Sequence, residues 1–156
     1  MSRAFVKESD QETETLPERT LSPHPNLVSM RGLALLEERV RTLEAERAAA
    51  RASGDDAARA RIARDLRYFQ ARRDSARLVT PDLHPQQLRF GVRARLRAAD
   101  GAEHRYQIVG EDEADPAAGL ISYVSPLAAA LLGGRVGDVV PFGGGALEIL
   151  ALESPS

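Results

Sequence analysis

Between residues 29 and 79, apolar residues, with arginine at three of the positions, recur at alternating spacings of three and four. This is the heptad spacing by which two α-helices pack along a seam. The stripe is interrupted by the turn-forming sequence Ser-Gly-Asp-Asp at 53–56 and then resumes. The stripe positions are Leu33, Leu36, Val40, Leu43, Arg47 and Ala50, then Arg59, Ile62, Leu66, Phe69, Arg73 and Ala76. Because a tight turn joins two helices of similar length, about 23 residues each, we predict an antiparallel coiled-coil hairpin over 29–79.

The apolar residues change from a repeat of 3.5 residues to a repeat of two after a short linker, residues 80–88. Pro81 and Pro85 in this linker end the second helix. Alternating apolar and charged residues over 90–97 are typical of a half-buried strand. The Asp-Gly pair that follows predicts a hairpin turn, after which residues 104–109 return as the partner strand.

The remaining residues predict a small antiparallel sheet with one short helix. Residues 120–124 are a further strand, and residues 137–150 are a final hairpin. Between them, Ser125 can cap a helix that has Pro126 in its first turn. The predicted fold class is therefore α+β, with the coiled-coil hairpin followed by a sheet domain over residues 89–153.

Residues 1–28 carry three basic and five acidic groups, three prolines and few apolar residues. This composition predicts a mostly disordered acidic leader. The segment has no apolar stretch of the kind that a secretory signal contains, and nothing in the chain approaches the ~20 apolar residues that span a bilayer. We therefore expect a cytoplasmic protein that has no membrane partner.

Composition excludes several chemistries. The chain has 156 residues and no cysteine, which rules out disulfides, thiol catalysis and cysteine-ligated zinc. The net charge of −2 gives no global attraction to nucleic acid or anionic membranes. The predicted hairpin nevertheless has twelve basic and eight acidic residues, whereas residues 80–156 have six and ten.

Acidic residues are the strongest candidates for chemistry. Asp55 and Asp56 lie at the tip of the predicted rod, where two carboxylates could help to hold a hard cation in another protein's site. Capping of the second helix is the simpler interpretation of both residues, because Asp is favoured at helix starts. A second cluster, at residues 111–115, could attract a divalent cation, but its spacing does not match a calcium loop and a solvated acidic loop is the simpler interpretation. We expect no intrinsic metal or cofactor.

Residues 106–140, YQIVGEDEADPAAGLISYVSPLAAALLGGRVGDVV, resemble the C-terminal domain of the bacterial GreA/GreB transcription elongation factors. The shared pattern comprises an IVG-x-DEAD segment, a GLIS strand, an SP-x-A-x-ALL helix and a GD-x-V strand. The stretch HPNLVS-x-RGL-x-LLEE resembles family sequences near the start of their first helix, so the resemblance covers residues 24–152.

The resemblance implies an FKBP-like C-terminal fold and binding at the secondary channel of RNA polymerase. It implies a factor that is not itself an enzyme and that meets nucleic acid only within the elongation complex. In that family the hairpin enters the channel, and its tip acids support a second Mg²⁺ of the polymerase active site, which promotes cleavage of backtracked RNA.

This chain departs from the family pattern at the tip. Family members carry two functional acids three residues apart; Asp55 matches the first, and Ala58 stands at the second position. The side chain of Asp56 points elsewhere on a helix. Each arm is also shorter, by about ten residues, which removes roughly 15 Å of reach. Ser125 and Pro126 match the pair through which the family docks its C-terminal domain, and a plain helix cap explains the same pair.

The sequence is compatible with three functions. In the first, Asp55 and Asp56 assist the polymerase's own metal-dependent RNA hydrolysis. In the second, a short-hairpin regulator binds the channel without stimulating cleavage, as in the Rnk branch of the fold. The third is an FKBP-type prolyl isomerase, which conflicts with the aromatic content: such enzymes use an aromatic-lined pocket, and this chain has three tyrosines, four phenylalanines and no tryptophan.

Overall fold

The computed structural model describes residues 16–155, which form two compact units. Of these residues, the first unit contains 16–23 and 35–75, and the second contains 24–34 and 76–155. The boundaries predicted from the sequence divided the chain at residues 28, 79 and 88, so the start of the first helix is grouped differently here. Within the described residues, no helix combines the length and apolar character needed to cross a bilayer.

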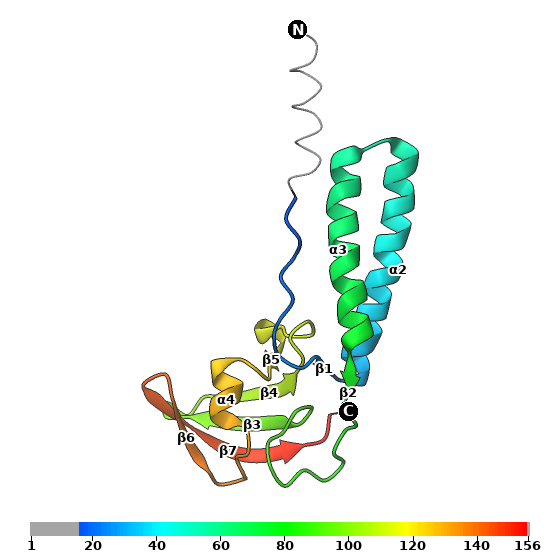
Figure 1. Ribbon diagram of the computed structural model, residues 1–156. Helices are drawn as coiled ribbons and strands as arrows, with labels where there is room; N and C mark the ends of the chain where they lie inside the picture. Colours follow the sequence, from blue (N-terminus) through cyan, green and yellow to red (C-terminus); the bar gives the residue numbers. More distant parts are fainter. Residues whose placement is uncertain (1–15, 156) are drawn as a thin grey trace. The chain divides into compact units, whose positions relative to one another are not determined.

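The first unit is a helical hairpin, which confirms the heptad prediction. Helix α2 (Met30–Ser53) belongs to this unit from Leu35 onward. Helix α3 (Asp56–Ser75) runs antiparallel beside α2 (Figure 1). The buried side chains of the seam are Val40, Leu43 and Ala50 from α2 and Ile62 and Leu66 from α3, with Ala58 and Phe69 packed against them. The two helices pack together because these heptad-spaced side chains become buried between them and are removed from water.

A two-residue turn at the predicted place joins the helices. Gly54 has a φ of +73°, the left-handed conformation that glycine adopts without strain. The amide of Asp55 then donates to the carbonyl of Ala50 at 3.2 Å, the bond that closes a Schellman motif at a helix end. Helix α2 therefore stops where its last carbonyls are satisfied, and α3 starts directly afterwards.

Helix α3 ends at Ser75, earlier than the heptad stripe predicted. Residues Arg77–Leu78 instead form strand β2, which pairs in parallel with β1 (Leu27–Val28). The amide of Arg77 donates to the carbonyl of Asn26 at 2.8 Å. A long-range backbone pairing replaces the last turn of the helix, and the periodicity of the second helix contains no signal for it.

The prediction that residues 1–28 are mostly disordered is wrong for residues 16–28, which are ordered in the structure. Residues 1–15 lie outside the described part. Val28 is buried, and the hydroxyl of Tyr123 donates to the carbonyl of Pro25. The backbone at Leu27 lies so close to Gly110 that a Cβ there would come within 2.3 Å of the Leu27 carbonyl oxygen. A polar composition therefore does not prevent order here, because the segment is held by contacts with distant parts of the chain.

The second unit is a five-stranded sheet with one helix, and Figure 1 shows its strands in the order β5-β4-β3-β7-β6. The strands are β3 (Arg93–Ala98), β4 (Glu103–Val109), β5 (Leu120–Ser122), β6 (Val139–Phe142) and β7 (Gly145–Glu153). Helix α4 (Pro126–Leu131) contributes Ala128 and Leu131 to a core that includes Leu96, Ile108 and Ile149. The α+β class is confirmed.

The prediction of a purely antiparallel sheet is wrong at β5. Strand β5 pairs in parallel with β4, with Gln107 opposite Leu120 and Val109 opposite Ser122. A tight hairpin forces antiparallel pairing, whereas a parallel neighbour requires a longer return path. The acidic loop after β4 supplies that path and includes a short 3₁₀ helix, η1 (Pro116–Ala118).

Candidate functional site

The first candidate site is the hairpin tip, where Asp55 lies directly before α3. Its Oδ1 atom accepts a hydrogen bond from the amide of Ala58 at 3.1 Å, and its carbonyl accepts from the amide of Arg59 at 3.0 Å. These are the bonds of a helix N-cap residue, which satisfies amides that have no partner within the helix. The capping role considered from the sequence is therefore present, and it holds one carboxylate oxygen in a defined position at the exposed tip.

Asp56 is the first residue of α3 and forms an ion pair with Arg59, one helical turn along, at 3.2 Å. Both side chains are largely exposed, so this pair adds little to stability. The two tip carboxylates are thus engaged differently: Asp55 binds the backbone and Asp56 binds a side chain. Asp56 directly follows Asp55, and the position one helical turn after Asp55 is occupied by Ala58.

Three arginines line a groove beside the tip. Arg47, Arg51 and Arg59 line a groove of about 310 Å³ together with Asp56. This groove makes the flank of the tip basic although the tip itself is acidic. Within residues 16–155, no group of three or more His, Asp or Glu side chains is arranged to hold a metal ion. Because Mg²⁺ takes six oxygen ligands, the two tip carboxylates can provide only part of a cation site.

The second candidate site is the Ser125–Pro126 pair at the start of α4. The Oγ of Ser125 accepts a hydrogen bond from the amide of Ala128 at 3.2 Å, and Pro126 takes the first helical position. This confirms the predicted cap. Pro126 is exposed, so the cap leaves its ring available at the surface. The docking role that the resemblance implies for this pair stays a prediction.

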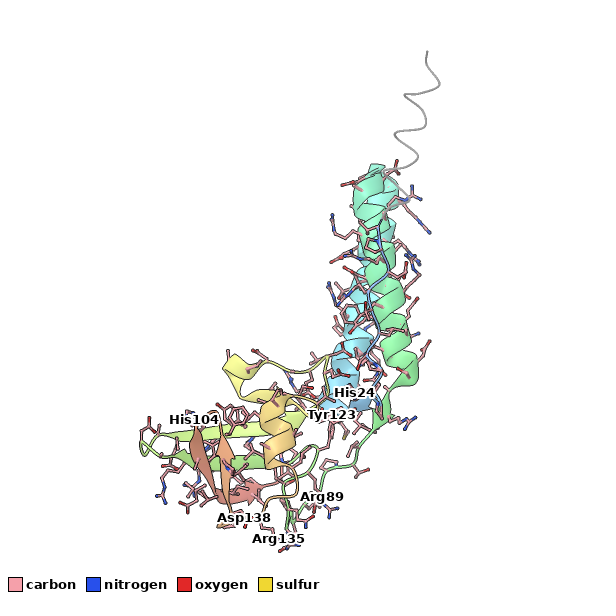
Figure 2. The ribbon with its side chains drawn as sticks, turned by 60° about the vertical axis from the view of Figure 1, so that its left-hand side comes forward. His24, Arg89, His104, Tyr123, Arg135 and Asp138 are labelled. Carbon is pink, nitrogen blue, oxygen red and sulfur yellow. The ribbon has the colours of Figure 1, made fainter. Side chains whose placement is uncertain are left out.

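The chain on both sides of α4 is held by side chains. Before the helix, the ring of Tyr123 meets Phe90 edge to face, with 5.7 Å between the ring centroids. After the helix, Asp138 Oδ2 accepts from the amide of Arg135 at 2.9 Å, and Figure 2 shows these two residues together.

Glu113, in the acidic loop after β4, is buried, which corrects the expectation of a solvated loop. Its Oε1 atom accepts from the hydroxyl of Ser29 at 2.6 Å, and its Oε2 atom accepts from Arg31 at 3.0 Å. The same Ser29 oxygen accepts from the amide of Gly32 at 2.9 Å and so caps α2. A Cβ on Gly32 would lie 2.8 Å from Oε1, so any other residue there would force the Glu113 carboxylate to shift. No spacing in the sequence indicates this buried carboxylate, since glutamates are normally exposed.

We expect Glu113→Ala to destabilise the second unit by about 2 kcal/mol, because the partly buried Ser29 hydroxyl loses its acceptor and Arg31 loses its partner. Arg31→Ala is the matched control. The Arg31 side chain is 62% exposed, and in this variant Glu113, whose side chain is 3% exposed, keeps its hydrogen bond from the Ser29 hydroxyl, so the loss should be smaller than in Glu113→Ala. Urea unfolding of the two variants measures both values. Equal losses would show that the ion pair, and not the hydroxyl bond, holds the loop.

The second unit also contains a hollow of about 510 Å³, which bears on the isomerase alternative. It is lined by Ser29, Met30, Arg31, Pro81, Arg93, Gln107, Glu113, Ala118, Leu120 and Pro155. None of these lining residues is aromatic, whereas a prolyl isomerase needs an aromatic-lined pocket for its substrate ring. This hollow therefore gives the isomerase alternative no support.

The family model and the sequence relatives point to the same family. The family described as "Transcription elongation factor, GreA/GreB, C-term" matches residues 83–153. The elongation factor GreA of Sinorhizobium medicae is 40% identical over 133 residues, covering 75% of this chain and 84% of the relative. The elongation factor GreB of Neisseria meningitidis serogroup A is 40% identical over 98 residues, and the chain spans only 60% of its length. The solved structure of Gfh1 from Thermus thermophilus aligns with a TM-score of 0.40 at 23% identity, covering 83% of this chain and 99% of that chain.

The fold and the two surface sites define a two-module protein, with a helical hairpin that is acidic at its tip and a small α+β domain. The extended match to GreA identifies it further: the chain belongs to the GreA/GreB family of transcription elongation factors. This confirms the resemblance read from the IVG-x-DEAD, GLIS and SP-x-A-x-ALL segments.

Proposed function

We propose that this protein binds RNA polymerase, places its hairpin in the secondary channel and stimulates cleavage of backtracked RNA. The observation that carries the proposal is the 40% identity to GreA over 133 residues, together with an acid, Asp55, at the hairpin tip. In this proposal the chain is not itself an enzyme, since the hydrolysis is the polymerase's own reaction.

The tip geometry supports a shared cation site better than a resident one. Mg²⁺ requires six oxygen ligands in octahedral geometry, and the tip offers two carboxylates at most. The capping bond uses Asp55 Oδ1, while a carboxylate has two oxygens and about four lone-pair sites. Capping therefore orients Asp55 and still leaves oxygen capacity for a metal whose other ligands come from the polymerase and water.

A second candidate function is polymerase binding without stimulated cleavage, and specific observations favour it. Ala58 stands where the family pattern has its second acid, and Asp56 is paired with Arg59. The two helices have 24 and 20 residues, or about 36 and 30 Å. A short rod with one well-placed acid would occupy the channel and compete there without completing the metal site.

RNA cleavage in a stalled, backtracked elongation complex tests the proposal. Cleavage is measured with and without the protein on the cognate polymerase, and binding is followed in parallel. We expect faster release of the RNA 3′ fragment when the protein is added. Binding without faster cleavage would assign the protein to the second function, and absence of binding would overturn both.

The docking role of the second site predicts that Pro126→Ala weakens polymerase binding about fivefold, the loss that follows when a contact worth about 1 kcal/mol is removed. The cap made by Ser125 is retained in this variant, so α4 should persist. Pro116→Ala is the control, because Pro116 also starts a short helix and is exposed. A competition assay compares the two variants. If they bind equally, Pro126 is only a helix-start residue.

A further inference from the structure

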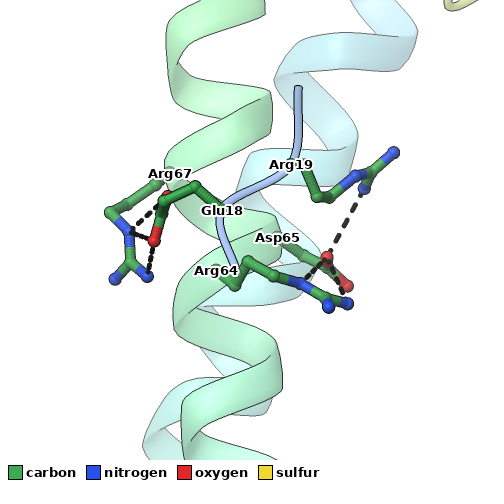
Figure 3. Close-up of polar contacts among 5 residues, drawn as sticks. All are labelled: Glu18, Arg19, Arg64, Asp65 and Arg67. Carbon is green, nitrogen blue, oxygen red and sulfur yellow. Dashed lines mark hydrogen bonds and ion pairs between the residues drawn. The ribbon is translucent and has the colours of Figure 1, made fainter. Parts of the chain in front are cut away.

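Residues 16–23, which we call the strap, run along helix α3 in the first unit. Glu18 accepts hydrogen bonds from Arg67 Nε at 3.0 Å to each of its carboxylate oxygens, and a further one from the same guanidinium group (Figure 3). Such two-oxygen pairing with a guanidinium is geometrically specific. The strap is therefore attached to α3 at a defined residue and not merely adjacent to it.

The next residue of the strap makes a second, different attachment. The guanidinium of Arg19 lies 3.9 Å from the ring centroid of Tyr68 and 5.1 Å from that of Phe69. It also forms an ion pair with Asp65 at 3.5 Å, and Figure 3 shows Arg64 on the same carboxylate. Arginine above an aromatic face is a favourable cation–π arrangement. Arg19 thus uses its charge and its flat surface together.

The two attachments are complementary in order. A Glu-Arg dipeptide on the strap meets Arg67 and Asp65 on α3, so each charge has its opposite. A shift of the strap by one residue would place Arg19 at Arg67 or Glu18 at Asp65, which is repulsive. We call Asp65, Arg67, Tyr68 and Phe69 the α3 seat. The α3 seat recognises an extended peptide by charge order and by aromatic contact.

The attachments are also reversible, because they lie at the surface. The side chains of Glu18 and Arg67 are 62% and 55% exposed, and that of Arg19 is 39% exposed. Ion pairs of this kind are individually weak and are screened by salt. The hydrogen bonds from Arg67 lower the pKa of Glu18 below its ordinary 4.5, with Arg64 adding to the effect. Glu18 therefore stays charged above pH 4.5, and protonation breaks the pair only as pH falls through the lowered pKa. At neutral pH, the agents that can release the strap are salt and competing charges.

We propose that the strap is a self-masking latch: it covers the α3 seat in the free protein and is displaced by an acidic segment of the polymerase, which takes the place of Glu18 on Arg67. This inference rests on the proposed insertion of the hairpin into the polymerase. It deepens that proposal by naming a regulatory element in this chain. A strap that is closed about four-fifths of the time would lower the apparent affinity for the polymerase about fivefold.

The first experiment measures whether the strap is seated. The chain has no cysteine, so Thr20→Cys accepts a single nitroxide label beside the two anchoring residues. In the closed latch the label broadens the NMR signals of the Tyr68 and Phe69 rings. We expect Glu18→Arg to remove the broadening, the double variant Glu18→Arg/Arg67→Glu to restore it, and 1 M salt to remove it in the parent chain. Broadening that is absent at low salt in the parent chain would overturn the latch.

The second experiment measures the consequence for binding. Glu18→Arg should bind the polymerase about fivefold more tightly, because the α3 seat is no longer covered. Glu46→Arg is the matched control, since it makes the same charge change at an exposed position of α2. Arg67→Ala also opens the latch but removes the residue that the polymerase acid would contact, so its affinity should not rise.

The outcomes separate the latch from the proposed function. Release of the strap with unchanged affinity, or with an equal gain in Glu46→Arg, would overturn masking and leave polymerase binding intact. A gain in Arg67→Ala as large as in Glu18→Arg would overturn the exchange of acids on Arg67. If the parent chain and every variant fail to bind the polymerase, the proposed function is overturned, and the latch mechanism with it.

Discussion

Asp55→Asn is expected to lower stimulated RNA cleavage at least about tenfold while leaving the fold and the affinity for polymerase unchanged. The side chain of Asn lacks the negative charge that a Mg²⁺ ligand provides, and loss of one ligand or its support typically costs this much in a metal site. Asparagine is as good a helix N-cap as aspartate, so the bond to the amide of Ala58 is retained. The measurement is the rate of RNA cleavage in a backtracked complex saturated with each protein.

The choice of asparagine separates two roles that alanine would mix. Asp55→Ala removes the cap as well as the charge and should cost about 1 kcal/mol of stability. Asp56→Asn is the companion variant: it breaks the exposed pair with Arg59 and should leave cleavage within about twofold. Full cleavage by Asp55→Asn would remove the tip acid from the mechanism. A loss in Asp56→Asn as large as in Asp55→Asn would show that Asp56 replaces the second family acid.

Gly110→Ala is expected to destabilise the second unit by about 3 kcal/mol, near the upper end of the cost of overpacking. The new Cβ would lie 2.3 Å from the carbonyl oxygen of Leu27. This neighbour is backbone and belongs to strand β1, which is paired with β2, so it cannot rotate away as a side chain would. Differential scanning calorimetry should show a melting temperature lower by about 15 °C for a unit of this size.

Gly145→Ala is the matched control for this steric argument. Its Cβ would meet nothing closer than 3.8 Å, and its backbone is not in the left-handed region. It should change stability by less than about 0.5 kcal/mol. If Gly110→Ala is equally harmless, the segment before α2 is not held against the β4 end as the structure shows.

Features that depend on neighbouring residues were predictable. The heptad stripe gave both helices, because side chains three and four residues apart share one face. Gly54 and Asp55 marked the turn because each solves a local problem at a helix end. The cap at Ser125 was likewise readable from a Ser-Pro pair. Asp55 and Ser125 could thus be named as candidates, although their roles toward a partner are not encoded in a cap.

Features that depend on distant residues were not predictable. The polar segment 16–28 has the composition of a disordered leader, yet ion pairs to α3 and a strand pairing order it. Glu113 sits among acids that suggest solvent, and only its approach to Ser29 makes it a buried acceptor. The parallel partner of β4 was missed because strand direction depends on the path of the loop, which periodicity does not describe.

The boundary between the two sets is physical. Helix stripes, caps and turns are determined within about one or two helical turns, so the residues that make them are neighbours in the chain. The strap on α3 and the Ser29–Glu113 bond join residues 49 and 84 positions apart, so folding alone brings them together. The amino-acid pattern therefore specified a hairpin, a sheet domain and two candidate surfaces. The packed structure decided which acid is buried, which strand is parallel and where residues 16–28 bind.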